Sequence, residues 1–186
     1  MSEAIKRMAD DIEEILFDEQ TIKARVKELG RQLTEDYAGK EVVMIGILKG
    51  AVVFFADLMR EMDVEMKIDF MGISSYGDAA KTSGIVRITK DMDTSITGKH
   101  LIIAEDIMDS GLTLSHLIRL LNERKPASIR TACLLDKTSR RECDITPDYC
   151  GFSIPDAFVV GYGLDYRGFY RNLPYIGVLK PEIYTE

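Results

Sequence analysis

Short apolar runs alternate with stretches of helical periodicity along most of the chain. The runs Val42 to Leu48 and Leu101 to Ala104 contain no polar side chain, which is typical of buried strands in a parallel sheet. Ser128 to Leu135, which ends in an apolar stretch, reads as the next strand. Apolar residues recur at helical spacing in the segments 51–62 and 112–124, which lie between these runs. Strands that alternate with helices predict an α/β fold, with a central, mainly parallel twisted sheet flanked by helices.

The pattern before and after the first of these runs predicts further elements. Ile12 to Phe17 reads as a short strand, and Asp18 can cap a helix whose apolar positions are Ile22, Val26, Leu29, Leu33 and Tyr37. Met66 to Ile73 and Ile85 to Ile88 read as the two strands of a long hairpin. Its polar tip could act as a lid that excludes water, or could be a disordered hairpin tip.

Composition and charge narrow the class of protein. A length of 186 residues predicts one domain with a substantial core, and 46% hydrophobic with 30% charged residues is ordinary for a globular protein. The net charge of −7 argues against a general nucleic-acid binder. Cys133, Cys143 and Cys150 form no CxxC pair, so we expect reduced thiols. Without a signal peptide or an apolar run of membrane-spanning length, we expect no membrane association and a cytoplasmic location.

The segment after the strand at 101–104 carries the most informative chemistry. Glu105 and Asp106 are predicted at the carboxyl end of this strand, where ligands bind in open α/β folds. Ser110, Gly111 and Thr113 then open the next helix. Glycine allows close approach of the backbone, the hydroxyl groups are donors, and a helix N-terminus offers free N–H groups, so this loop favours a phosphate.

Carboxylates beside a phosphate site need an explanation. Glu105, Asp106 and Asp109 would repel a simple anion, but carboxylates accept hydrogen bonds from a ribose diol and bind Mg²⁺. The alternative is a surface loop whose acids are favoured only by the helix dipole. The combination of residues predicts a ligand that is part sugar and part phosphate, bound with Mg²⁺.

The stretch LIIAEDIMDSGLTL at 101–114 closely resembles the phosphoribosyl-pyrophosphate motif of type I phosphoribosyltransferases, in the form found in the hypoxanthine-guanine branch. The segment 154–174 is similar to a second run of that branch, and the resemblance covers nearly the whole chain after Ile12. At Leu112 some relatives carry Lys instead. The resemblance implies a type I phosphoribosyltransferase fold, with a small hood lobe over the purine site.

That resemblance also implies a domain plan. Residues 1–186 would form a single phosphoribosyltransferase domain, with the hood built from about 1–17 and about 150–186. Relatives with this fold usually form dimers or tetramers, so we expect a homodimer or a homotetramer.

The resemblance assigns a role to each matching residue. Asp109 would be the catalytic general base. The ribose and the 5′-phosphate would contact Glu105, Asp106, Asp109, Ser110, Gly111, Leu112 and Thr113. The pyrophosphate would contact Lys49, Gly50, Ser75, Tyr76 and Arg171. The purine would contact Lys137, Phe158, Val159 and Asp165, and Mg²⁺ would be held by Glu105, Asp106 and Asp165.

Physical reasons support several of these roles. An ammonium at Lys137 can donate to the 6-oxo group of a purine but meets the amine of adenine with another donor. Phe158 can stack on a base, and the planar guanidinium of Arg171 suits pyrophosphate. Lys49 and Gly50 suit an anion because glycine lets backbone amides turn toward it. Taken one at a time, each lysine could be a solvated charge and Phe158 a core residue.

The expected reaction transfers 5-phosphoribose from phosphoribosyl pyrophosphate to N9 of hypoxanthine or guanine, giving IMP or GMP and pyrophosphate. Two alternatives remain open from the sequence. One is an enzyme of the same fold that takes adenine or a pyrimidine, which Lys137 and the Phe158 segment oppose. The other is a phosphoribosyl-pyrophosphate-sensing regulator that binds nucleic acid, which the short chain and the net charge of −7 oppose.

Overall fold

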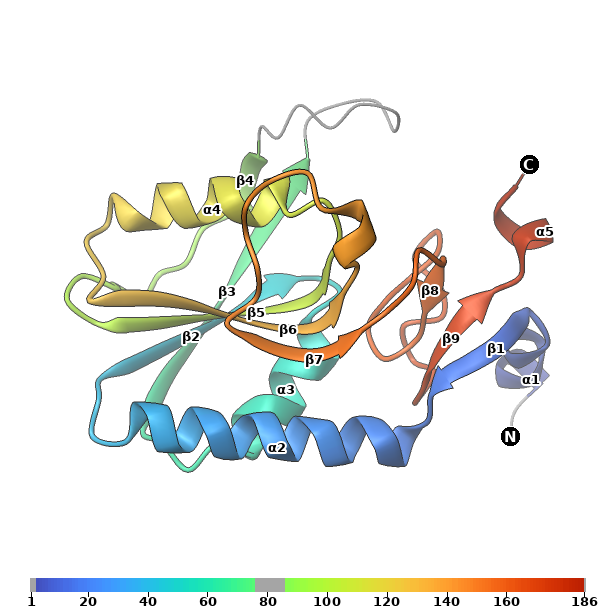
Figure 1. The fold of residues 1–186 in the computed structure, drawn as a ribbon, viewed down its shortest axis with the longest axis horizontal. Helices are drawn as coiled ribbons and strands as arrows, with labels where there is room; N and C mark the ends of the chain where they lie inside the picture. Colours follow the sequence, from blue (N-terminus) through green and yellow to red (C-terminus); the bar gives the residue numbers. More distant parts are fainter. Residues whose placement is uncertain (1–2, 76–85, 186) are drawn as a thin grey trace.

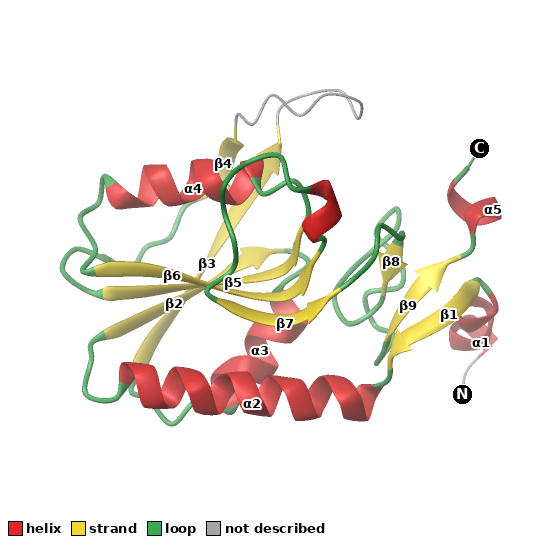
Figure 2. Cartoon of the chain, viewed as in Figure 1, coloured by secondary structure: helices red, strands yellow, loops and turns green. Residues whose placement is uncertain are grey.

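A six-stranded sheet forms the centre of the structure, a computed structural model that describes residues 3–75 and 86–185 (Figures 1 and 2). The strand order is β4 (Val86–Lys90), β3 (Met66–Ser75), β2 (Val42–Leu48), β5 (His100–Met108), β6 (Ser128–Asp136) and β7 (Tyr149–Ser153). Only β3 and β4 pair antiparallel, as the predicted hairpin requires, and the other neighbours are parallel. The predicted fold class, a mainly parallel sheet flanked by helices, is confirmed.

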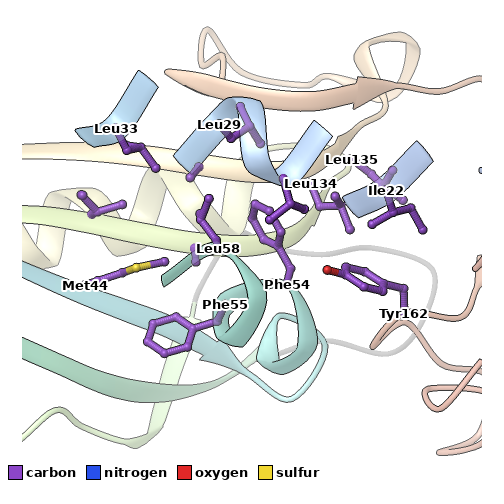
Figure 3. Packing of buried hydrophobic residues seen from close by; sticks show 14 of the residues in the cluster. Ile22, Leu29, Leu33, Met44, Phe54, Phe55, Leu58, Leu134, Leu135 and Tyr162 are labelled. Atoms are coloured by element: carbon purple, nitrogen blue, oxygen red, sulfur yellow. The ribbon is translucent and has the colours of Figure 1, made fainter. Parts of the chain in front are cut away.

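Helices cover both faces of this sheet (Figure 1). The helix α4 (Leu112–Asn122) lies on one face, and α2 (Glu19–Tyr37) and α3 (Val52–Arg60) lie on the other. The five apolar positions predicted for α2 are all buried, and the Asp18 side chain caps this helix by accepting a hydrogen bond of 2.7 Å from the N–H of Thr21. Figure 3 shows the α2 and α3 side chains packed against strand residues such as Met44 and Leu134.

A second, smaller sheet lies at one end of the large one, where both chain termini also lie (Figure 1). It is antiparallel, with the order β1 (Ile12–Phe17), β9 (Ile176–Leu179) and β8 (Val159–Val160). The short helices α1 (Glu3–Asp10) and α5 (Pro181–Tyr184) flank it. The strand predicted at 12–17 is confirmed, but its partner β9 comes from the opposite end of the chain and gave no clear signal in the sequence.

The central strand is longer than its apolar run. We expected it to end at Ala104, with Glu105 and Asp106 after it, but β5 continues to Met108 because β6 pairs with it as far as Met108 opposite Asp136. Both carboxylates therefore lie within the strand. Pairing between neighbouring strands decides this boundary, whereas hydrophobicity alone places it too early. The helices predicted at 51–62 and 112–124 are each slightly shorter in the structure, where they end at Arg60 and Asn122.

Asp69 on β3 secures the connection that leads to the central strand. Its carboxylate accepts hydrogen bonds from the N–H groups of Phe70, Asp93 and Thr94 at 2.7 to 2.9 Å. Burial raises the pKa of Asp69, but these donors outweigh it and lower the pKa to about 2. A pKa depressed in the folded state stabilises the fold above the unfolded value of 3.8, and this stabilisation is lost as the pH falls toward 2.

We therefore expect Asp69→Asn to lower the free energy of unfolding by about 2 kcal/mol at pH 7. The difference from the unmodified protein should shrink between pH 4 and pH 2, which urea unfolding at a series of pH values would measure. Asp93→Asn, in the same turn but with an exposed side chain, is the matched control and should have little effect. An equal loss at every pH would contradict this account of Asp69.

Two further expectations concern the whole chain. In the part that the structure describes, no helix is both long and apolar enough to cross a membrane. The three cysteines are free thiols, as predicted, with Cys133 buried and Cys143 and Cys150 partly exposed.

Candidate active site

Two adjoining pockets open where the carboxyl ends of β5 and β6 meet the loop after β5 and the small sheet. The first, the helix-mouth pocket, has a volume of ≈ 140 Å³ and is lined by Glu105, Ile107, Met108, Asp109, Ser110, Gly111, Thr113 and Leu114. The second, the hood pocket, has a volume of ≈ 250 Å³ and is lined by Asp106, Ile107, Asp109, Lys137, Phe158, Val159, Leu164 and Asp165. Ile107 and Asp109 belong to both pockets, so Asp109 stands on their common wall.

The loop that forms the helix-mouth pocket needs glycine at its centre. Gly111 has φ +79°, in the left-handed region, and a Cβ there would lie 2.6 Å from Ile145 Cγ2. The helix α4 begins at the next residue, Leu112, whose N–H donates to Ser110 Oγ at 3.3 Å. The other N–H groups of the first helical turn have no partner within the helix, which makes this pocket suitable for an anion.

Glu105 and Asp106 belong to different pockets. They are consecutive in β5, so their side chains point to opposite faces of the sheet, Glu105 toward the helix mouth and Asp106 toward the hood. Burial and the nearby Asp106 carboxylate raise the pKa of Glu105 well above its usual value. Among the described residues, the buried Glu105 Oε2 has no hydrogen-bond partner. A buried acceptor of this kind suits a ligand that brings hydroxyl donors.

The Asp106 carboxylate is packed against a backbone loop. Burial raises its pKa to about 6, although the N–H of Ile107 donates to it at 2.9 Å. A Cβ on Gly50, in the loop after β2, would lie only 1.6 Å from Asp106 Oδ2, and one on Gly163 would lie 2.1 Å from the Gly50 carbonyl oxygen. The peptide bond between Leu48 and Lys49 in this loop is cis. The absence of side chains at Gly50 and Gly163 thus lets the loop after β2 lie closely between Asp106 and the segment that contains Gly163.

Charged side chains from the last third of the chain complete this side of the site. Arg171 pairs with Asp165 at 2.6 Å and donates to the Gly163 carbonyl at 2.6 Å, which places its guanidinium beside the loop of Gly50. Lys137 follows β6 and is buried, with its Nζ 4.0 Å from an oxygen of Asp156.

Phe158 is not a core residue. Its side chain is 37% exposed and lines the hood pocket, whereas the next residue, Val159, is buried in β8. Its ring stacks on Tyr184 with centroids 4.8 Å apart and meets Tyr166 edge-on at 5.6 Å. The aromatic neighbours hold the Phe158 ring at the rim of the pocket, where it can stack on a planar ligand.

Among the residues that the structure describes, most of the predicted site residues come together around these two pockets. Ser75 ends β3 without a described side chain, and Tyr76 lies outside the described residues. Within the described ranges, Glu105, Asp106 and Asp165 form no cluster of the kind that would enclose a metal ion.

Three residues beside the site were missed from the sequence. Arg141 contacts the helix-mouth loop, Asp156 faces Lys137, and Tyr184 stacks on Phe158. Only Arg141 gave a signal, as part of the basic run after Lys137, and the sequence assigned it no role.

Comparison with known proteins agrees with this geometry. The sequence matches the phosphoribosyl transferase domain family over residues 13–167. It is 54% identical over 177 residues to the hypoxanthine-guanine phosphoribosyltransferase of Bacillus subtilis, covering 95% of this chain and 98% of that protein. The fold and the paired pockets thus define a phosphoribosyltransferase.

Solved structures narrow the assignment further. A hypoxanthine phosphoribosyltransferase from Staphylococcus aureus superposes with a TM-score of 0.94 at 50% identity, covering 96% of this chain and 97% of that one. The Trypanosoma cruzi hypoxanthine phosphoribosyltransferase, studied for the role of its C-terminal region in oligomeric state and activity, gives 0.89 at 42% identity, covering 94% of each chain. This chain belongs to the hypoxanthine-guanine phosphoribosyltransferase family.

Proposed function

We propose that this enzyme transfers 5-phosphoribose from phosphoribosyl pyrophosphate to N9 of hypoxanthine or guanine and releases pyrophosphate. The observation that carries the proposal is the position of Asp109 on the wall shared by two pockets of different chemistry. One pocket offers a helix N-terminus and hydroxyl groups, which suit a phosphate, and the other offers a lysine and an aromatic ring, which suit an oxopurine. A ribose that joins the two ligand groups would lie against Asp109.

The substrate parts follow from the pockets. The 5′-phosphate would bind the loop Asp109–Thr113, and the ribose diol would donate to Glu105, whose buried oxygen lacks a partner among the described residues. The pyrophosphate would lie toward Lys49, Gly50 and Arg171, and the family resemblance assigns Ser75 and Tyr76 to it as well. The purine would stack on Phe158 with its 6-oxo group on Lys137, its edge on the backbone of Val159 and its amine near Asp165.

Mg²⁺ fits the donor set only together with substrate. The carboxylates of Asp106 and Asp165 both line the hood pocket, and the charge of Asp165 contributes to the raised pKa of Asp106. Two carboxylates do not enclose an ion, but Mg²⁺ typically combines one or two carboxylates with substrate oxygens and water. We propose Asp106 and Asp165 as its holders, with Glu105 contributing through the ribose. When bound, Mg²⁺ supplies positive charge that neutralises the departing pyrophosphate.

Each residue of the site then has its own role in the reaction. As the bond from the purine N9 to the anomeric carbon forms, the bond to pyrophosphate breaks, and the ribose carries oxocarbenium-like charge. Asp109 accepts the proton that the purine ring gives up. Lys137 stabilises negative charge that develops on the 6-oxo group. Glu105 and the helix-mouth loop hold the ribose 5-phosphate in place throughout.

A base panel tests this function. The purified protein is incubated with phosphoribosyl pyrophosphate, Mg²⁺ and one base at a time, and pyrophosphate release is measured. We expect turnover with hypoxanthine and guanine, and none with adenine, because Lys137 would meet the adenine amine with a second donor. Orotate tests the pyrimidine alternative, and we expect no turnover with it. Turnover of adenine at the rate of hypoxanthine would overturn the assignment of the base. A gel-shift assay with nucleic acid tests the regulator alternative, for which we expect no shift.

We also propose that the small sheet acts as the hood over the purine and that the enzyme is cytoplasmic. The strand β7 pairs with β6 in the large sheet, so the C-terminal part of the hood would begin after Ser153 rather than near residue 150. The rest of the hood would comprise residues up to 17, which reach β9 through β1, so that residues 1–186 act as one domain.

We propose a homodimer that forms along the uncovered side of β3. Ile68 on β3 and Val52 at the start of α3 are 46% and 40% exposed, and the same two elements contact each other through the rings of Phe55 and Phe70. Exposed apolar residues at the rim of a core cluster suit a self-complementary interface between two copies. A tetramer of two such dimers is the alternative.

Ile68→Glu should therefore shift the protein from dimer to monomer at micromolar concentration, as measured by light scattering after gel filtration. A charge at the centre of such an interface weakens association by about 100-fold or more. Ile15→Glu is the matched control, because Ile15 is 53% exposed on the small sheet, away from β3. An unchanged mass for Ile68→Glu would place the interface elsewhere.

A further inference from the structure

We propose that Arg141 is a positioning residue that turns the helix-mouth loop toward the 5′-phosphate and fixes this loop to the strand that carries Lys137. The inference rests on the function proposed above, in which that loop binds the phosphate. Arg141 lines neither pocket and contacts the loop from its outer side.

The guanidinium of Arg141 joins two elements. Its Nη1 donates to the carbonyl oxygen of Asp109 at 2.7 Å, and its Nη2 forms an ion pair with the carboxylate of Asp136. The side chains of Arg141 and Asp136 are only 14% and 7% exposed. A rigid, planar guanidinium can hold both acceptors at once, which the single ammonium of a lysine cannot do in the same geometry.

The residues after Arg141 engage the next carbonyl of the loop. The N–H of Glu142 donates to the Ser110 carbonyl at 3.0 Å, and Cys143 Sγ lies 3.6 Å from the same oxygen. The carbonyls of both Asp109 and Ser110 are therefore held on the outer side. In a trans peptide the N–H points opposite to the preceding C=O, so the N–H groups of Ser110 and Gly111 are turned inward, toward the helix-mouth pocket.

The same contacts couple the two pockets. Asp136 is the last residue of β6, and the next residue, Lys137, donates its backbone N–H to the Met108 carbonyl at 2.9 Å. Arg141 thus ties the phosphate loop to the strand end from which the purine lysine extends. The Arg141–Asp136 ion pair would therefore help to set the distance between the bound phosphate and the bound purine, although neither residue lines a pocket.

The test compares binding of IMP with binding of inosine, which lacks the phosphate, by titration calorimetry. Arg141→Met should weaken IMP binding by about 10- to 100-fold and change inosine binding by less than about 3-fold. Arg141→Lys keeps the charge beside Asp136, so it should restore thermal stability but not IMP affinity. In Arg141→Ala, added guanidinium ion should recover part of the affinity for IMP and none for inosine.

Arg130→Met is the matched control. Arg130 lies near the start of β6, whereas Asp136 is the last residue of that strand, and Arg130 pairs with Asp148 at 2.7 Å. Removing the Arg130 side chain should therefore leave the binding of both ligands unchanged. Equal weakening of IMP and inosine by Arg141→Met, or IMP affinity within about 3-fold of the unmodified protein in Arg141→Lys, would overturn the role of Arg141. Thr113→Val distinguishes failure of the proposed phosphate site from failure of the proposed role of Arg141. Unchanged IMP binding in Thr113→Val would overturn the phosphate site itself. If Arg141→Met does not fold, the Lys variant decides.

Discussion

Asp109→Asn should lower kcat by about 100- to 10,000-fold while the KM for phosphoribosyl pyrophosphate stays within a few-fold. The amide keeps the size of the side chain and one acceptor oxygen, but it cannot take a proton from the purine. Asp109 stands between the helix-mouth pocket and the hood pocket, where it would reach the reacting ring without holding either end of the substrate. Steady-state kinetics, first with hypoxanthine varied and then with phosphoribosyl pyrophosphate varied, would measure kcat and the KM of each substrate separately.

The control for Asp109 is another carboxylate at the rim of the site. Asp156 faces Lys137 and Arg140 and lines neither pocket, so Asp156→Asn should reduce kcat far less than Asp109→Asn. If kcat in Asp109→Asn stays near that of the unmodified enzyme, Asp109 is not the base.

Lys137→Met should lower kcat/KM for hypoxanthine and guanine by about 100-fold or more, with little change in the affinity for phosphoribosyl pyrophosphate. The methionine retains the aliphatic stem, which is buried, but removes the donor to the 6-oxo group. Calorimetry would follow phosphoribosyl-pyrophosphate binding, and initial rates would follow the use of each purine.

Lys49→Met is the complementary variant, because Lys49 is assigned to the pyrophosphate end. It should weaken phosphoribosyl-pyrophosphate binding more than purine use. Equal damage to both substrates in Lys137→Met would contradict the assignment of that lysine to the purine.

The sequence predicted much of the large sheet for a physical reason. A strand that is buried on both faces must be apolar throughout, so β2 and most of β5 and β6 are visible as runs. The same holds for α2, where one face is buried and its five apolar positions recur at helical spacing. The small sheet was not predicted as a unit, because β1 pairs with β9 from the opposite end of the chain and β8 is only two residues long.

The residues of the site also fall into those that the local sequence predicted and those that it did not. The chemistry of the loop from Asp109 to Thr113 could be read locally, because a glycine, hydroxyl groups and a helix start act on a ligand together within a few residues. Arg141 and Tyr184 could not be found in this way, since each acts on a residue far from it in the chain, on Asp109 and Phe158 respectively. The structure also separates neighbours in the sequence, because Glu105 and Asp106, which were assigned together to the ribose and the metal, face different pockets.

By itself, the sequence determined the α/β class and, through its resemblance to relatives, the family, and it led to the proposal that the loop after β5 binds a phosphate. Periodicity and local residue chemistry carry this information, since each depends only on neighbours along the chain. The tertiary structure alone decided that Asp109 lies between two pockets, that Asp106 packs on Gly50, and that Arg141 supports the loop from behind. Those relations depend on strand pairing and on close packing between distant segments, which hydrophobic pattern does not encode.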